Sequence, residues 1–353
     1  MAVTLHIDAA RPEWITVRPS PLAELCAALH ALDEPGHHPA SQSWVSAVHS
    51  GVTGDLLTRA TVWAPLWGAF RARYLLPLTA GAERSLGAEL DGIARLPVDA
   101  FTALTVQALI GKNPTSGEPP PDPAGVLPRL RLISLGRYDL GLRLIEDPAR
   151  FRGELLDFLA AFAAAAFDEE WRRVRAAVDP DVQTRLRQLR LRGVTGAFDG
   201  IGAVADDPPR VVFDKLYHAT VRLDARMPCV LVPSAHGDSH LVVKHVPGYA
   251  VVVQYPVVPA VEAVPVEEMR RRLAALQDPT RLLICRDILR HPAATAELAA
   301  RLGMTSPQIS RHLRQLREVG LVSTHRHGAV VYYRLNVDAI RRLGPDLLSG
   351  LRH

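Results

Sequence analysis

The sequence predicts an α+β protein in two parts: a short C-terminal domain of helices with a β-hairpin, and a longer, mostly helical N-terminal domain with a small antiparallel sheet. Three observations support this architecture. Helix start and stop signals lie close together after residue 266. Apolar residues at 209–256 follow the two-residue period of strands, and prolines concentrate at 256–265. We therefore expect an N-terminal domain at 1–255, a proline-rich linker at 256–265 and a C-terminal domain at 266–353.

The most clearly delimited helix of the C-terminal domain begins near residue 305. Thr305 and Gln308 have the spacing of a capping box, and Gly320 supplies a left-handed end. Apolar residues at spacings of four and three form one narrow inward stripe: Ile309, Leu313 and Leu316. The opposite face is polar and rich in arginine. The helix is therefore anchored on one side and offers hydrogen-bond donors on the other.

The segments around this helix complete a recognisable domain. "TAELAARLGM" predicts a preceding short helix that ends in a turn at Gly303, and "GLVSTHRHGAVVYYRL" predicts two strands joined near Gly328. Helix, turn, helix and hairpin make a winged helix-turn-helix. Upstream, "LQDPTRLLICRDIL" predicts another helix, with Asp278 as its N-cap and Pro279 as its first residue. Its expected core-facing residues are Leu282, Leu283, Ile288 and Leu289.

Together these motifs resemble the ArsR-type winged-helix repressors, bacterial DNA-binding homodimers that leave their operator when an inducer binds. The resemblance covers about residues 266–340. Metal-sensing members carry clustered cysteines on the first helix of the helix-turn-helix, or Asp and His pairs on the C-terminal helix. Here "ELAARLG" has no thiol, and the C-terminal region offers Asp338 and His353 without paired histidines. The resemblance thus implies a repressor architecture without the inherited metal sites, and we expect no metal and no cofactor.

The second helix of the helix-turn-helix is expected to enter the major groove of duplex DNA while the hairpin follows the backbone. Ser306, Gln308 and Arg311 are placed for base contact, and Ser310, His312 and Arg314 for phosphate. The complete set of expected DNA-binding residues is Thr305, Ser306, Gln308, Ser310, Arg311, His312, Arg314, Arg326 and His327. The alternative is that these are ordinary solvated residues of a small domain.

The charge distribution favours the DNA-binding interpretation. Residues 262–353 contain fifteen arginines and no lysine against nine Asp and Glu, a net charge of plus six. The whole chain has 41 basic and 37 acidic residues, which leaves 26 against 28 upstream, a net of minus two. The basic excess is therefore confined to the proposed DNA-binding end.

The N-terminal domain is expected to be mostly helical. Ser20 and Pro21 mark the start of one helix, and a long helix runs through 151–178. Residues 209–256 predict short strands in a meander. The chain shows no secretory leader, no membrane-length apolar stretch and an odd number of separated cysteines, so we expect a cytoplasmic protein with no membrane partner.

No enzyme is predicted, and no catalytic residue is assigned. The chain contains neither a phosphate-binding loop nor a nucleophile elbow. The nearest approach to a metal constellation is the loop "SAHGDSH" with His245 and Cys229, which we interpret as surface histidines. The arginines at 185–192, where "LRQLR" repeats residues 313–317, are interpreted as a solvated or partner-binding face. The five tryptophans all lie upstream and could line an apolar pocket or fill the core.

We therefore expect a homodimeric repressor that reads an inverted-repeat operator in double-stranded DNA. Its N-terminal domain would sense a small-molecule effector or set the dimer. The alternative is an N-terminal enzyme or protein-binding domain, with the winged helix used only for association.

Overall fold

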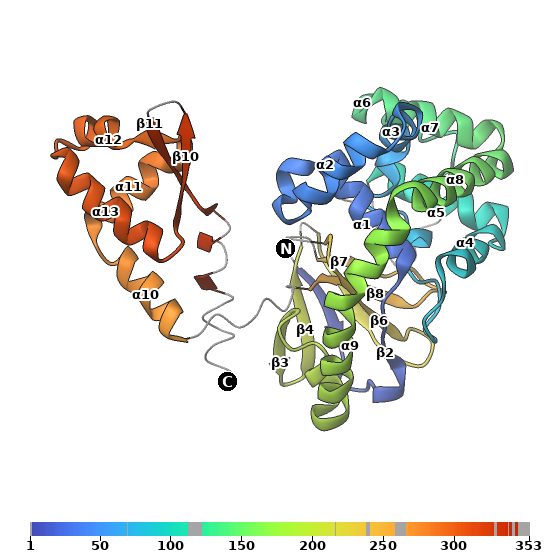
Figure 1. Cartoon of the computed structure of the whole chain (residues 1–353). Coiled ribbons are helices and arrows are strands. Elements are labelled where there is room, and N and C mark those ends of the chain that lie inside the picture. Colours follow the sequence, from blue (N-terminus) through green and yellow to red (C-terminus); the bar gives the residue numbers. More distant parts are fainter. Residues whose placement is uncertain are drawn as a thin grey trace. The chain divides into compact units, whose positions relative to one another are not determined.

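The computed structural model describes residues 2–68, 70–111, 122–215, 217–237, 241–257, 266–327, 330–337, 339–340 and 343–344. The chain forms two compact units, Met1–Pro259 and Ala260–His353 (Figure 1). Most of the linker expected at 256–265 lies outside the described residues, and Pro256 is the last residue of a strand. The expected α+β class and the C-terminal winged helix are confirmed.

Helices make up the larger part of the first unit. They are α1 (Pro21–Asp33), α2 (Gln42–Gly51), α3 (Gly54–Trp63), α4 (Leu86–Ala94), α5 (Val98–Ile110), α6 (Leu127–Ile133), α7 (Leu135–Glu146), α8 (Pro148–Phe162) and α9 (Asp168–Ala197). A π-helical turn, Ala163–Phe167, joins α8 to α9. The cap of α1 is as expected, since the Ser20 hydroxyl accepts a hydrogen bond from the N–H of Ala23.

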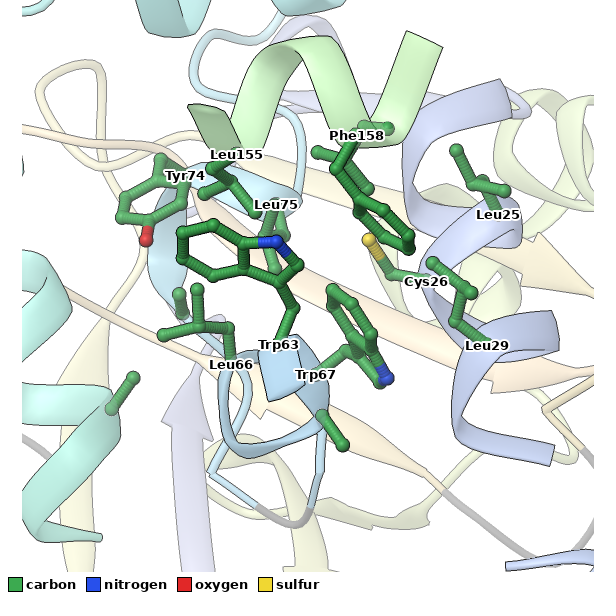
Figure 2. Packing of buried hydrophobic residues seen from close by; sticks show 14 of the residues in the cluster. Leu25, Cys26, Leu29, Trp63, Leu66, Trp67, Tyr74, Leu75, Leu155 and Phe158 are labelled. Carbon is green, nitrogen blue, oxygen red and sulfur yellow. The ribbon is translucent and has the colours of Figure 1, made fainter. Parts of the chain in front are cut away.

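The helical core is built around aromatic side chains. Trp63 and Trp67 are buried, and Trp67 stacks on Phe158 with ring centroids 5.8 Å apart. Figure 2 shows these rings between Leu155 of α8 and the α1 residues Leu25, Cys26 and Leu29. These two tryptophans therefore fill core, as their bulk favours.

The strands of this unit form two four-stranded sheets. They are β1 (Ala2–His6), β2 (Ile15–Val17), β3 (Ala203–Asp206), β4 (Pro209–Asp214), β5 (Ala219–Arg222), β6 (Cys229–Ser234), β7 (Val242–Lys244) and β8 (Val251–Pro256). One sheet has the order β3-β4-β1-β5 and the other β2-β6-β8-β7. In the second sheet β2, β6 and β8 are parallel, and β7 is antiparallel to β8.

The predicted antiparallel meander at 209–256 is wrong in its topology. The N-terminal strands β1 and β2 each enter a different sheet: β1 lies between β4 and β5, and β2 pairs with β6. The parallel pairs β1–β5, β2–β6 and β6–β8 therefore interrupt the expected meander, while β3–β4 and β7–β8 pair as antiparallel neighbours in sequence. The runs "CVLVPS" and "VVVQYP" are buried almost throughout instead of alternating, as expected for strands covered on both faces.

Helix α9 packs along both sheets. Its buried residues Val174, Val178 and Val182 share one core with strands β1 and β2. Arg185 belongs to the arginine stretch expected to be solvated, yet its side chain is buried. It lies over the ring of Tyr255 and donates hydrogen bonds to the backbone carbonyls of Ala197 and Asp199. A guanidinium can be buried here because carbonyls and a carboxylate satisfy its donors.

The second unit contains α10 (Val266–Leu276), α11 (Pro279–Arg290), β9 (Ala293–Ala294), α12 (Thr295–Leu302), α13 (Ser306–Glu318), β10 (Val322–His327) and β11 (Val330–Leu335). Its sheet has the order β10-β11-β9. Asp278 caps α11 as expected, accepting a hydrogen bond from the N–H of Arg281 at 3.1 Å.

The expected core face of α11 needs correction. Leu282, Leu283 and Leu289 are 50%, 40% and 55% exposed, whereas Ile284, Cys285 and Ile288 are buried. Residues 284, 285 and 288 follow the spacing of one helical stripe, and this stripe packs towards α13 and β11. The choice between two apolar stripes depended on the neighbouring elements, which the helix sequence does not reveal.

All three cysteines, Cys26, Cys229 and Cys285, are buried free thiols. Burial raises the pKa of Cys26 to about 12 and that of Cys285 to about 11. Within the described residues no single helix is long and apolar enough to span a membrane; α4 and α5 meet that length and composition test only as a bent pair.

Candidate nucleic-acid interface and a buried charge cluster

The turn between α12 and α13 sets the orientation of the second helix. Gly303 ends α12 in the left-handed region with φ of 64°, which glycine adopts without strain. The N–H of Met304 then bonds to the carbonyl of Ala299 at 3.0 Å. Helix α13 begins at once, and Gln308 Oε1 accepts a hydrogen bond from the backbone N–H of Thr305 at 2.9 Å.

Helix α13 is held by its apolar stripe. Ile309, Leu313 and Leu316 are completely buried, as expected from their spacing. The exposed residues of the expected set on this helix and its cap are Thr305, Ser306, Gln308, Ser310, Arg311 and Arg314. Arg314 has one neighbouring carboxylate, that of Glu318 at 3.9 Å, and both side chains are 63% exposed. The helix therefore presents polar and cationic side chains to solvent on a fixed apolar base.

His312 is placed differently from the other expected contacts. Its side chain is half-buried and its Nδ1 is enclosed without a hydrogen-bond partner in the described part of the chain. The neighbouring carboxylate is that of Asp278 at the start of α11. His312 thus points towards the domain interior more than towards the surface shared by Arg311 and Arg314.

The hairpin supplies the remaining expected residues. Arg326 and His327 end strand β10 and pair with Val331 and Val330 of β11. Arg326 is exposed, while the orientation of the His327 side chain and the hairpin tip at Gly328 lie outside the described residues. Helix α13 packs against β10, so helix and hairpin belong to one rigid scaffold.

A second concentration of charge lies inside the first unit. His236, two residues after β6, is 2% exposed and lies between two carboxylates. Its Nδ1 is 2.9 Å from Glu24 Oε1, and its Nε2 forms an ion pair with Glu170 Oε1 at 3.0 Å. The same Glu24 oxygen accepts the backbone N–H of His236 at 2.9 Å. Three segments far apart in the sequence, α1, α9 and the end of β6, meet at this imidazole.

The electrostatics of the cluster favour a protonated imidazole. Burial alone would lower the pKa of His236, but hydrogen bonding and ion pairing with Glu170 and Glu24 outweigh it and raise the pKa to about 9. Burial would raise the pKa of Glu170, but Arg173 and His236 lower it to about 2. Arg173 binds Glu170 through both carboxylate oxygens. The four side chains therefore carry two positive and two negative charges.

The sequence interpretation of "SAHGDSH" as surface histidines is wrong for His236. Two signals could have pointed to the cluster. Glu24 is the acidic residue of a helix, "PLAELCAALHAL", that is apolar apart from it and His30, and His236 lies two residues after a strand that is buried throughout. A buried acid and a buried histidine need partners, but the sequence does not show which residues pair. Among the described residues no group of His, Cys, Asp and Glu could hold a metal, and Asp238 and His240 lie outside them.

A second buried carboxylate, that of Glu89, binds the N-terminal residues of α1. Glu89 of α4 accepts hydrogen bonds from the Ser20 hydroxyl at 2.8 Å and from the N–H of Leu22 at 3.0 Å. Arg18 completes the group with an ion pair at 3.2 Å. The anion-attracting N-terminus of α1 is thus already occupied by a side chain of the protein.

Comparison with known proteins matches the two units separately. The model of a family of unknown function (DUF5937) matches residues 1–260, and that of bacterial regulatory proteins of the arsR family matches residues 278–324.

Among curated relatives, the nodulation protein NolR of Rhizobium meliloti is 35% identical over 71 residues, or 20% of this chain and 58% of NolR. The transcriptional repressor SdpR of Bacillus subtilis is 35% identical over 21% of this chain and 81% of its own length. The solved structure of NolR from Sinorhizobium fredii is 32% identical, covers 23% of this chain and 82% of that one, and has a TM-score of 0.21. This chain thus spans less than two thirds of the length of the nodulation protein NolR of Rhizobium meliloti.

Proposed function

Because the chain belongs to the family of unknown function DUF5937 through residues 1–260 and ends in an arsR-family regulatory domain, we propose that it is a sequence-specific DNA-binding transcriptional regulator. The observation that carries this proposal is helix α13. Its buried stripe fixes the helix, and its exposed face gathers Gln308, Arg311 and Arg314 behind a glycine turn and beside a hairpin. That combination suits a helix that lies in the major groove.

The side chains of α13 divide by their place on the helix. Ser306, Gln308 and Arg311 occupy its first turns and would contact base edges, where an arginine can bind guanine through two hydrogen bonds. Ser310 and Arg314 would contact phosphates, and Thr305 would bring its hydroxyl near the backbone. His312, half-buried, would take part only after its ring rotates outward. Arg326 and His327 at the end of β10 would reach a neighbouring phosphate or the minor groove.

We propose that the regulator acts as a homodimer on an inverted repeat. One helix in one groove reads few bases, and two-fold symmetry doubles the recognised sequence. The exposed apolar residues Leu273, Leu282 and Leu289 support this proposal, since Leu282 and Leu289 are seven residues apart and share one face of α11. The segment after residue 340 lies mostly outside the described residues.

Repression and release by an effector complete the proposal. SdpR, the relative covered over most of its length, is a transcriptional repressor. The large first unit would then sense the effector or set the dimer, connected through the segment at 256–265. Because SdpR is a transcriptional repressor, we assign no catalytic role to this chain. Such a regulator would act on DNA in the cytoplasm.

The deciding experiment is selection of bound sequences from random duplex DNA by the full-length protein at near-physiological salt. We expect enrichment of an inverted repeat whose half-sites lie about one helical turn apart. The Arg311→Ala/Arg314→Ala protein, selected in parallel, should enrich the repeat more weakly and with a relaxed base preference at the position that Arg311 contacts. A folded wild-type protein that enriches no sequence would contradict direct operator reading.

A further inference from the structure

The first unit contains an open cavity of about 700 Å³ beside the buried charge cluster. Helix α2 contributes Trp44, Ala47 and Val48 to one wall. The π-helical turn contributes Ala165 and Ala166 to the lining. Its size lies within the range of pockets that bind small organic molecules.

The indole of Trp44 connects α2 to the π-helical turn. Trp44 is 7% exposed, and its Nε1 points to the carbonyl of Ala166 at 3.4 Å. Its ring meets the imidazole of His236 edge to face, with centroids 5.1 Å apart. The polar atom of the indole is therefore directed at the protein, and its apolar ring lines the space. π-helical turns inside long helices occur frequently at functional sites.

The cavity lies where sheets of this kind bind their ligands. His236 follows the carboxyl end of β6, and Glu24 stands in the first turn of α1, the helix that follows β2. Both strands belong to the parallel part of the second sheet. Glu170, the third member of the cluster, is itself part of the cavity lining. Ligands in sheets with parallel strands bind outside the carboxyl ends of those strands.

The charges of the lining cancel. Within the described residues the cavity is lined by two carboxylates, Glu169 and Glu170, and two guanidiniums, Arg172 and Arg173. Glu170 and Arg173 already bind each other through two contacts. Glu169 and Arg172, both exposed, stand three residues apart on α9 and balance one another. A ligand with a net charge would find no excess of opposite charge here, whereas an apolar ring would find Trp44, Val48 and the alanines.

We propose that this cavity binds a neutral, mostly apolar organic molecule with an aromatic or polycyclic ring, packed against Trp44 and the π-helical turn. The ring would pack on the indole and the small side chains. A hydroxyl or carbonyl at its edge would reach Glu169 or Arg172. That occupancy of the cavity also controls the operator rests on the proposed function; the binding itself does not.

The test uses the full chain, without DNA, and the neutral polycyclic dye Nile red, whose emission increases in apolar surroundings. We expect saturable binding that 2-naphthol displaces, while the anion 2-naphthoate and the cation 2-naphthylmethylammonium displace it at least roughly tenfold less well. Equal displacement by either charged analogue would overturn the neutral ligand class.

Two variants locate the binding. Ala165→Phe and Ala47→Phe place a ring into the cavity from two different elements, the π-helical turn and α2, and both positions are exposed, so the core is undisturbed. Each should weaken Nile red binding by roughly tenfold or more. Ala149→Phe, exposed on α8 but outside the cavity lining, is the matched control and should bind as the wild type does. Unchanged binding in both cavity variants, with thermal unfolding like that of the control, would overturn the site.

A final arm separates this inference from the proposed function. Nile red is added to the protein bound to its selected operator, and retention of DNA is measured with wild type and Ala165→Phe. Release from the wild type alone supports an effector role, and full retention with the cavity occupied overturns that role. A protein that binds the dye but selects no operator would contradict the proposed function and leave the cavity site standing.

Discussion

The pentapeptide "LRQLR" occurs at 186–190 in α9 and again at 313–317 in α13, and the two copies are packed differently. In α13, which follows a glycine turn, both leucines of the string are completely buried and its arginines are exposed. In α9 the arginine next to the string, Arg185, is buried against Tyr255. The arginines inside the string are exposed in both copies, so the difference lies in a flanking residue: Arg185 holds elements of the first unit together, whereas Arg311 in the second unit is exposed to solvent.

The largest effect is expected where charge is most deeply buried. His236→Gln removes the cation between Glu24 and Glu170 and leaves two buried carboxylates, which should lower the free energy of unfolding by about 3–5 kcal/mol. Urea denaturation measures this loss. The matched control is His37→Gln, because His37 also pairs with a glutamate, at 2.8 Å, but is 68% exposed. The control should change the free energy of unfolding by less than about 0.5 kcal/mol. An equal loss of stability in both variants would contradict the expected difference between buried and exposed ion pairs.

The same histidine should give the first unit a pH dependence. The pKa of His236 is raised to about 9 in the folded chain from an ordinary 6.5, so its contribution is complete below pH 6.5 and is lost as the pH rises through 9. The loss should approach about 3 kcal/mol. Lys244, whose pKa burial lowers to about 7, titrates in this range with the opposite sign. The informative quantity is therefore the difference between wild type and His236→Gln across pH 6 to 10, and a difference that does not shrink would exclude a protonated imidazole.

The two copies of "LRQLR" allow a matched test of the exposed charges. Arg311→Ala/Arg314→Ala should weaken operator binding by about 1–3 kcal/mol for the base contact, and should reduce the salt slope by about one for the phosphate contact. Arg187→Ala/Arg190→Ala removes two exposed arginines with the same spacing from α9. That variant should bind the operator as the wild type does. Equal losses in both would mean that net charge, and not the helix-turn-helix, determines binding.

The smallest effect is expected for a local motif found in both units, an aspartate that caps the start of a helix. Asp147 and Asp278 each precede a proline, and each accepts a hydrogen bond from the backbone N–H of an arginine three residues on, at 2.9 Å and 3.1 Å. Asp147→Ala and Asp278→Ala should each cost about 1 kcal/mol in urea denaturation. A clear inequality between them would show that the caps depend on more than their local sequence.

These comparisons explain what the sequence could predict. Caps, glycine ends and helical spacing involve residues within a few positions of one another, so the helix-turn-helix, its buried stripe and the hairpin were predicted correctly. The same holds for the starts of α1 and α11. Interactions of this range depend little on the rest of the fold.

Features that depend on distant segments were not predicted. The meander failed because β1 and β2, at the other end of the chain, enter the two sheets. The predicted core face of α11 was wrong because Leu282 and Ile284 are equally apolar, and only the packing against α13 and β11 selects between them. The Glu24–His236–Glu170 cluster joins residues up to 212 positions apart. The DNA-contacting residues stay a prediction.

The burial of every thiol has a practical consequence for watching this molecule work. Cys26, Cys229 and Cys285 are enclosed and carry raised pKa values, so the native chain should react slowly with maleimides. A cysteine introduced at the exposed Ser323 on β10 would then take up a fluorophore alone, with no native residue replaced first. In the proposed homodimer, energy transfer between two such labels would follow the separation of the two hairpins as the protein binds and releases DNA.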